Sequence, residues 1–300
     1  MIKSIFLFFQ ILFLFPVLVM SQAIQDFRLY EDSLRHLALS IPAGNSDSER
    51  KQANEQFAGY FKEVLLLEGA FHYGFDSLNT ISILKAPDES FRIITWYVPL
   101  QDDNFEYLGF FQFNNPVNPE KKLITLQKSE IHNSDLQSVT LEHEKWYGCY
   151  YTDLIHRTHD QQDYYLLIGW RADNPMTRKR ILEPLHFSET GMPLFGKQVF
   201  QFEDNSHHRI IFEYSSKVSM TIRYDDYLFP ENSYPEKVII FDRLVPTKSF
   251  LKGHYQFYVP EMNIFDAFRF VDGNWIFVED IDMRNPRRNP PTRPLPLDSQ

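Results

Sequence analysis

Two groups of carboxylates in this sequence have a spacing that could serve catalysis or metal binding. Asp225 and Asp226 are adjacent, and Asp280 and Asp282 alternate within the run Glu279–Asp282. Two carboxyl groups that face each other across a cleft can hydrolyse a glycosidic bond. An Asp-x-Asp run with an asparagine nearby can hold calcium. Adjacent acids at strand ends also guard the edge of a sheet, which is the interpretation that we favour over catalysis and calcium.

The tryptophans are the second group of candidate binding residues. All four lie in predicted strands, at Trp96, Trp146, Trp170 and Trp275. A flat aromatic face can stack on the apolar face of a sugar ring, so the first three are candidate ligand-binding residues for a glycan. Core packing is the simpler interpretation, because burying one aromatic side chain removes roughly 150–250 Å² from water.

Other signatures of catalysis or metal binding are missing from the sequence. There is no glycine-rich phosphate loop, no Gly-x-Ser-x-Gly, no His-Glu-x-x-His and no Cys-x-x-Cys. His156 and His159 would share one face of a helix, but their surroundings are typical of strands, where the two rings would point to opposite sides. We therefore expect no metal and no cofactor, and we expect Cys149 to be a buried, inert thiol.

The first residues of the chain have the pattern of a secretory signal peptide. Lys3 precedes an apolar run from Ile5 to Met20, and the small residues Ser21 and Ala23 follow it. The apolar run is short for a bilayer span, and Pro16 interrupts it, so a cleaved signal over residues 1–23 is favoured over a retained membrane anchor. This pattern predicts a secreted or periplasmic protein with no integral membrane segment after cleavage.

Charge and cysteine content narrow the class of partner. The chain has 40 acidic and 30 basic residues and a formal charge of −10, which argues against nucleic acid and disfavours an anionic membrane surface. The single cysteine excludes an intramolecular disulfide, so the core must hold by packing. The partners that remain are a glycan or an envelope protein.

Residues 24–70 have the periodicity of a helical hairpin. Apolar side chains recur every three or four residues from Phe27 to Leu37, and the first helix is predicted to end before Pro42. Ser46 and Glu49 form the sequence of a capping box at the start of the second helix.

Residues 71–285 change to short β-type runs separated by turn residues, which predicts a long antiparallel meander. Such a meander folds as a rolled sheet, a barrel-like sheet or a sandwich; a propeller is less favoured because no fixed-period repeat is present. The run from Arg180 to Phe187 contains Pro184, so at best it is expected to be an edge strand. Residues 286–300 contain five prolines among arginines and are expected to be a disordered tail.

Several strand motifs occur together in a recognisable order. They are Phe75-Asp-Ser-Leu78, Ala86-Pro-Asp-Glu-Ser-Phe-Arg-Ile-Ile-Thr-Trp96, Trp146-Tyr-Gly148, Tyr165-Leu-Leu-Ile-Gly-Trp170, Phe241-Asp-Arg-Leu-Val-Pro246 and Phe265-Asp-Ala-Phe268. As a set, this pattern resembles an uncharacterised family of secreted Bacteroidetes proteins of unknown function, over residues 70–285. The resemblance implies secretion and a single β-rich unit, and it supplies no activity or site residues.

The sequence thus predicts a secreted or periplasmic, mainly β protein that acts as a binding or envelope-associated module. The alternative is a hydrolase acting on glycans or other envelope polymers through carboxylates such as Asp225, Asp226, Asp280 or Asp282. That alternative requires two acids in one cleft beside an exposed tryptophan.

Overall fold

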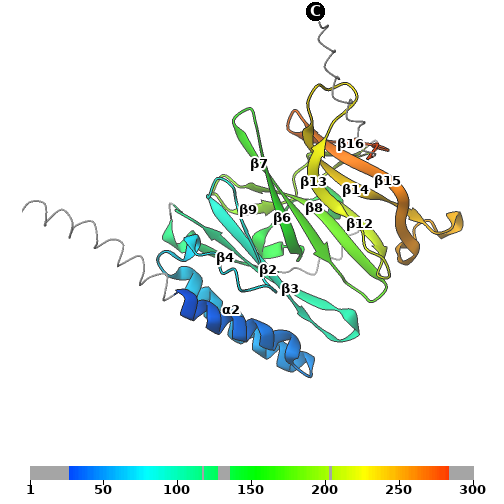
Figure 1. Ribbon diagram of the computed structural model, residues 1–300. Coiled ribbons are helices and arrows are strands. Elements are labelled where there is room, and N and C mark those ends of the chain that lie inside the picture. Colours follow the sequence, from blue (N-terminus) through cyan, green and yellow to red (C-terminus); the bar gives the residue numbers. More distant parts are fainter. Residues whose placement is uncertain (1–26, 117, 128–135, 203–204, 284–300) are drawn as a thin grey trace, which may run out of the picture.

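Two helices form one outer layer of the protein (Figure 1). The structure is a computed structural model and describes residues 27–283 except 117, 128–135 and 203–204, so the predicted signal peptide and tail lie outside the described residues. The first helix covers residues 27–43 of the described chain, and the second is α2 (Asp47–Leu66). The predicted helical hairpin is confirmed.

The ends of these helices differ in detail from the prediction. The Ser46 hydroxyl caps α2 by accepting a hydrogen bond from the Glu49 amide at 3.2 Å. The Glu49 carboxylate reaches back one residue further than expected, to the amide of Asn45 at 2.8 Å. The first helix continues through Pro42 because Ile41, only 3% exposed, packs its last turn against the core.

The first sheet is a four-stranded antiparallel meander in the order β1-β2-β3-β4. Its strands are β1 (Ser82–Lys85), β2 (Phe91–Pro99), β3 (Phe105–Phe113) and β4 (Leu123–Leu126).

The second sheet has the order β5-β9-β8-β7-β6, with β12 also paired to β8. Its strands are β5 (Leu141–Glu142), β6 (Tyr150–His159), β7 (Gln162–Arg171), β8 (Thr177–Phe187), β9 (Pro193–Phe195) and β12 (Ile210–Ser215).

The strand that contains Pro184 is internal to this sheet, so the edge-strand prediction for Arg180–Phe187 is wrong. One side of β8 pairs with β7, and the other side pairs first with β12, up to Leu182, and then with β9, from Leu185. Pro184 falls in the gap between those two partners. The missing N–H of proline is tolerated where a strand changes partners.

The third sheet has the order β11-β10-β16-β15-β14-β13, and its only parallel pair among the described strands is β10 with β16. Its strands are β10 (Phe200–Phe202), β11 (Asn205–His207), β13 (Ile222–Tyr227), β14 (Glu236–Pro246), β15 (Tyr258–Val271) and β16 (Asn274–Val278). Short 3₁₀ helices connect strands of all three sheets, at Ala70–His72, Gln101–Asp103, Pro119–Lys121, Leu136–Ser138, His143–Lys145, Ser249–Leu251 and Tyr255–Phe257.

These elements stack as layers, with the helices at one end and the third sheet at the other (Figure 1). Phe57 and Phe61 of α2 pack against Trp96 and Phe110 on one face of the first sheet. The other face packs on the second sheet, which in turn packs its far face on the third. Because the first two sheets are covered on both faces, β2 and β7 are nearly continuous apolar runs, whereas β13, at an edge of the third sheet, fully buries only Ile222. The predicted mainly β fold is confirmed as a sandwich-like stack of open sheets.

No helix within residues 27–283 that the structure describes is long and apolar enough to cross a membrane.

A fully buried ion pair crosses the second sheet. Arg209 and Glu183 are both 0% exposed, and Nε of Arg209 lies 2.6 Å from a Glu183 oxygen. The other Glu183 oxygen accepts from the Tyr151 hydroxyl at 2.9 Å. Arg209 also donates to the carbonyls of Leu136, Val139 and Phe195, so one guanidinium joins the segment 136–139 and the end of β9 to Glu183 of β8.

We expect the substitution Arg209→Met to lower the free energy of unfolding by about 3–5 kcal/mol, because it leaves the Glu183 charge buried without its partner. Arg35→Met is the control, since Arg35 and Asp32 form an exposed pair 3.4 Å apart and such pairs contribute less than about 1 kcal/mol. Equal losses in a denaturant titration of the two variants would contradict this role.

Cys149 provides a second test of the core. Its side chain is fully buried, and burial raises the pKa of the thiol well above its usual value. Cys149 should therefore react slowly with a thiol reagent in native protein and rapidly in denaturant. A Ser219→Cys variant provides the reaction rate of an exposed thiol as a reference. If Cys149 in native protein reacted at that rate, its side chain would not be buried.

Candidate functional site

Two of the three candidate tryptophans are packed inside the protein. Trp96 is 1% exposed, and its indole N–H donates to the Asn54 side chain on α2 at 2.7 Å. Trp146 is 0% exposed and donates to the Tyr151 hydroxyl at 2.9 Å. Both rings have a protein partner for their one polar atom, so they contribute to packing and are not part of an open site.

The predicted aspartates lie on the surface of the third sheet. Asp225 and Asp226 are exposed on the edge strand β13, where Asp226 pairs with Lys237 at 3.2 Å. Asp280 and Asp282 follow β16, and the amide of Asp282 donates to the Tyr227 hydroxyl at 3.2 Å. The chain after β16 therefore reaches β13, whose adjacent residues Asp225 and Asp226 point to opposite faces of the sheet.

The two pairs nevertheless do not share one cavity. A hollow of about 650 Å³ is lined by Asp280 and Asp282 together with Asn263, Phe265 and other residues, but not by Asp225 or Asp226. Trp275, the tryptophan of this sheet, is 2% exposed. Neither of the two predicted aspartate pairs therefore lies in a cleft beside an exposed tryptophan, as the hydrolase alternative requires of them.

The histidine cluster does not form a metal site in the described chain. His156 and His159 lie on β6, and His156 contacts Asp163 on β7 at 2.7 Å. No group of three or more metal-ligating side chains is present among the described residues.

Trp170, the third candidate, is half-buried within a cluster of rings at the end of β7. Its ring centroid lies 5.4 Å from that of Phe105 and 5.7 Å from that of Tyr97. Tyr97 also contacts Tyr150 at 5.5 Å and is 36% exposed. We call these four residues, Tyr97, Phe105, Tyr150 and Trp170, the aromatic cluster.

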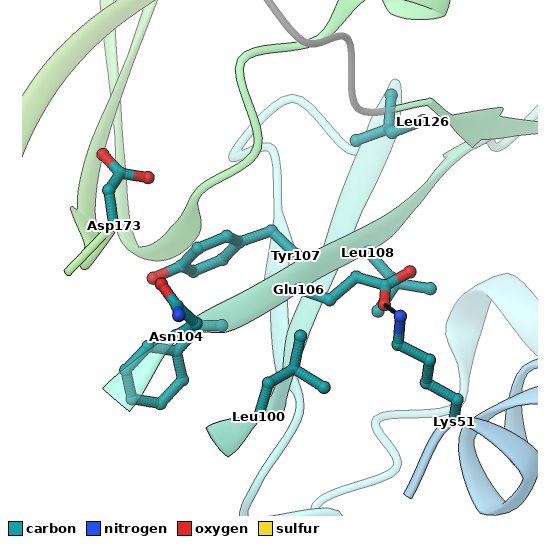
Figure 2. A pocket seen from close by; sticks show the side chains of 9 residues that line it. Lys51, Leu100, Asn104, Glu106, Tyr107, Leu108, Leu126 and Asp173 are labelled. Atoms are coloured by element: carbon teal, nitrogen blue, oxygen red, sulfur yellow. Dashed lines mark ion pairs between the residues drawn. The ribbon is translucent and has the colours of Figure 1, made fainter. Parts of the chain in front are cut away.

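A pocket of about 610 Å³, shown in Figure 2, includes Phe105 of the aromatic cluster in its lining. Its residues come from α2, from β3 and the turn before it, from β4 and from the turn after β7, and they are Lys51, Leu100, Asn104, Phe105, Glu106, Tyr107, Leu108, Leu126 and Asp173. In Figure 2, Lys51 and Glu106 lie on one side of the Tyr107 ring and Asp173 on the other. Phe105 belongs both to the pocket and to the aromatic cluster, so the two features are continuous.

The pocket lies along a part of β3 that has a strand on one side only. β2 pairs with the whole of β3, from Phe105 to Phe113, but among the described strands β4 pairs only with Gly109–Gln112. Residues 105–108 therefore present an edge without a strand partner there. Edges of this kind offer main-chain N–H and C=O groups to a ligand.

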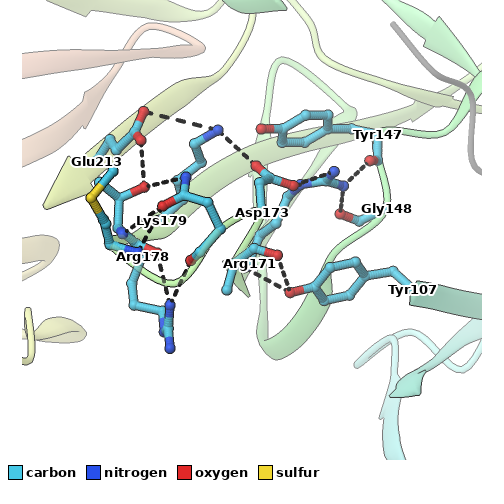
Figure 3. Close-up of polar contacts among 12 residues, drawn as sticks. Tyr107, Tyr147, Gly148, Arg171, Asp173, Arg178, Lys179 and Glu213 are labelled. Atoms are coloured by element: carbon cyan, nitrogen blue, oxygen red, sulfur yellow. Dashed lines mark hydrogen bonds and ion pairs between the residues drawn. The ribbon is translucent and has the colours of Figure 1, made fainter. Parts of the chain in front are cut away.

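The Asp173 wall of the pocket is held by a polar cluster that is shown in Figure 3. Arg171, 7% exposed, donates from Nε to one Asp173 oxygen at 2.6 Å, and Lys179 donates to the other at 2.7 Å. Arg171 also donates to the carbonyls of Tyr147 and Gly148 and lies 4.3 Å from the Tyr147 ring. Each Asp173 oxygen thus has a cationic partner, and the carboxylate is fixed in position.

The charges in this cluster set the ionisation of Asp173. Burial raises the pKa of its carboxyl group, but the hydrogen bonds and positive charges of Arg171 and Lys179 outweigh burial, so the pKa is lowered. Burial alone would lower the pKa of Lys179, but Tyr147, Asp173 and Glu213 raise it. Both groups are charged at neutral pH, and Asp173 is a hydrogen-bond acceptor rather than a proton donor.

Tyr107 joins the pocket to the second sheet. Its hydroxyl accepts the amide hydrogen of Ala172 at 2.7 Å. Burial raises the pKa of this hydroxyl, which therefore stays protonated. The contact sets the position of Asp173, the next residue, relative to β3.

Sequence reasoning identified Trp170 and missed the rest of this site. Phe105 and Tyr107 had the appearance of ordinary strand residues, and Asp173 was part of a turn. Arg171 is the residue from which the site could have been predicted. Its charge directly follows the apolar run Leu166–Trp170 and therefore needs a buried partner.

A comparison of the chain with protein-family models, with curated proteins and with solved structures finds no match to any of them. The function of the pocket is therefore argued from its geometry.

We expect Asp173→Asn to lower the free energy of unfolding at neutral pH by about 1.5–3 kcal/mol, the range for hydrogen bonds to charged groups. Because folding lowers the pKa of Asp173, its contribution is complete above the unfolded value of about 3.9 and is lost as the pH falls through the folded value. The difference between wild type and variant should therefore shrink below about pH 4.

Denaturant titrations across this pH range measure the effect. Asp226→Asn is the control, because Asp226 belongs to an exposed ion pair with Lys237, and it should cost less than about 1 kcal/mol. A difference between wild type and Asp173→Asn that does not change with pH would contradict the role of the Asp173 charge.

Proposed function

We propose that this protein is a secreted or periplasmic binding protein and that its ligand is a glycan, held in the pocket beside Phe105 and Tyr107. The observation that carries the proposal is the continuity between a polar pocket of about 610 Å³ and the aromatic cluster. A ligand with both apolar faces and many hydroxyl groups fits such a surface, and sugars have both.

The aromatic cluster supports this ligand class. Tyr97 and Trp170 keep part of their surface open to solvent, although aromatic rings are costly to leave exposed. They are held by contacts with Phe105 and Tyr150, so little side-chain freedom would be lost when a sugar ring stacks on them.

The polar lining of the pocket supports it as well. Glu106 is paired with Lys51 at 3.4 Å, and both side chains remain partly exposed, at 38% and 53%. Asp173 and Asn104 add fixed acceptors, and the edge of β3 adds main-chain groups. A few fixed polar groups beside apolar walls are typical of sites that bind small ligands.

We limit the proposal to binding. Glycoside hydrolysis needs one carboxyl group whose pKa is raised so that it can protonate the leaving oxygen. The pKa of Asp173 is lowered instead, by Arg171 and Lys179.

Tryptophan fluorescence provides a direct test. Trp96, Trp146 and Trp275 are at most 2% exposed, so a ligand in the pocket should change the emission of Trp170 alone. We expect one or more of the cello-, xylo-, manno- and chito-oligosaccharides and peptidoglycan fragments to raise the melting temperature and to change the emission. Phe105→Ala and Glu106→Gln should each weaken that binding at least about tenfold, which corresponds to about 1.4 kcal/mol.

Trp170→Phe should remove the emission change while calorimetry still detects binding. Tyr234→Ala is the control, because Tyr234 is 81% exposed on the loop between β13 and β14, away from the pocket, and it should bind like wild type. No response to any of these glycans, or binding that Phe105→Ala and Glu106→Gln leave unchanged, would refute the proposal.

A further inference from the structure

The hairpin between β14 and β15 exposes large apolar side chains at its tip. Phe250 is 75% exposed, Tyr255 45% and Phe257 42%. Single exposed apolar residues are common on protein surfaces, but several aromatic rings on one tip mark a site of interaction.

The same tip is basic within an acidic protein. Residues 243–260 contain Arg243, Lys248, Lys252 and His254 and no Asp or Glu, although the whole chain has a formal charge of −10. Lys248, Lys252 and His254 are exposed. The closest acids along the chain are Asp242 and Glu261, at the base of the hairpin. Arg243, at the base, is paired with Asp266 and Glu279, so the positive charge of the tip itself comes from the exposed Lys248 and Lys252. Charges beyond about 10 Å are largely screened at ordinary salt, so this charge acts locally.

The tip has a defined shape. The 3₁₀ turns Ser249–Leu251 and Tyr255–Phe257 are closed by main-chain hydrogen bonds, such as Leu251 to Lys248 at 2.9 Å and Phe257 to His254 at 3.0 Å. The amide of Gly253, which has φ +85°, donates to the Tyr258 hydroxyl at 3.1 Å. The backbone that carries the exposed rings is therefore fixed before any partner binds, which reduces the entropy cost of binding.

We propose that this tip binds the anionic surface of a lipid bilayer, with Phe250 inserted among the headgroups and Lys248 and Lys252 on the lipid phosphates. Aromatic residues prefer the membrane–water interface, and lysines near a membrane are attracted to anionic lipids. The hairpin extends beyond the ends of β14 and β15, two inner strands of the third sheet (Figure 1), and its turn Tyr255–Phe257 contacts β12. A convex tip of this kind fits a bilayer, which deforms around it, better than a folded protein, which would need a matching groove. This inference does not depend on the glycan proposal.

Vesicle flotation tests the proposal, with phosphatidylcholine alone and with phosphatidylcholine mixed with phosphatidylglycerol. The full chain is used throughout, so the apolar residues near its start contribute equally in every variant. We expect binding to be at least about tenfold stronger to the anionic vesicles. Phe250→Ala should lower it several-fold, and Lys248→Glu with Lys252→Glu should remove the preference for anionic lipid.

Matched controls separate the tip from overall charge. Lys62→Glu with Lys217→Glu makes the same change in net charge at exposed lysines elsewhere, and Tyr234→Ala removes an exposed ring elsewhere; both should float like wild type. The emission of a Phe250→Trp variant should shift to shorter wavelength with anionic vesicles, whereas that of Tyr234→Trp should not. Equal binding to the two vesicle types, or equal loss in control and tip variants, would overturn the proposal. Binding to neither vesicle would also overturn it and would favour a protein contact for the tip.

Discussion

Buried arginines that hold main-chain carbonyls are the interaction on which the rest of this structure depends. In the described part of the chain, Arg92, Arg171 and Arg209 are each at most 7% exposed. Each has one side-chain acceptor, which is Gln112 for Arg92, Asp173 for Arg171 and Glu183 for Arg209. Their other N–H groups bind carbonyls of the connecting segments. A single cysteine rules out an intramolecular disulfide. The five donors of a guanidinium instead attach several loops to a sheet at once, provided that each donor is satisfied.

This constraint explains why the candidate site lies where it does. Arg171 fixes the turn that follows β7 onto the carbonyls of Tyr147 and Gly148, and it thereby presents Asp173 to the pocket. The same kind of contact attaches the end of α2 to the first sheet: Arg92 binds the carbonyls of Ala70 and Tyr73, just after the helix. The pocket is bounded by the turn that Arg171 fixes and by the edge of β3, whereas the segment that Arg92 holds does not line it. Its shape therefore depends on buried charges that do not themselves contact its interior.

The sequence predicted the helices and strands well, but it did not predict which of them pair or pack together. The apolar periodicity of residues 27–37 and the change to short β-type runs after residue 70 were interpreted correctly, because burial on a face leaves a local pattern. The edge-strand prediction failed because proline is acceptable in this internal strand only where the partner changes from β12 to β9. That change is made by Ile210 and Phe195, which lie 26 and 11 positions after Pro184. The pocket was not predicted from the sequence for the same reason. Lys51, Tyr107 and Asp173 meet only through tertiary packing, and no spacing in the chain records that meeting.

The high aromatic content of the chain was its strongest compositional signal. The exposure of a ring to solvent, however, and not its presence in the sequence, distinguishes a candidate binding residue from one that packs the core. Of 28 phenylalanines and 16 tyrosines, most that are described build the interfaces between layers, where rings on two sheets interlock. Rings left in solvent carry a cost, and apart from Tyr234 the exposed rings of the described chain gather in two places of opposite electrostatic character. The aromatic cluster with Tyr97 adjoins carboxylates at the junction of the first two sheets, whereas Phe250 stands among lysines on the third. The second sheet separates these two groups of exposed rings, and each group is fixed by its own local contacts. A substitution in one group should therefore leave binding at the other unchanged, so the ligand of each can be identified independently.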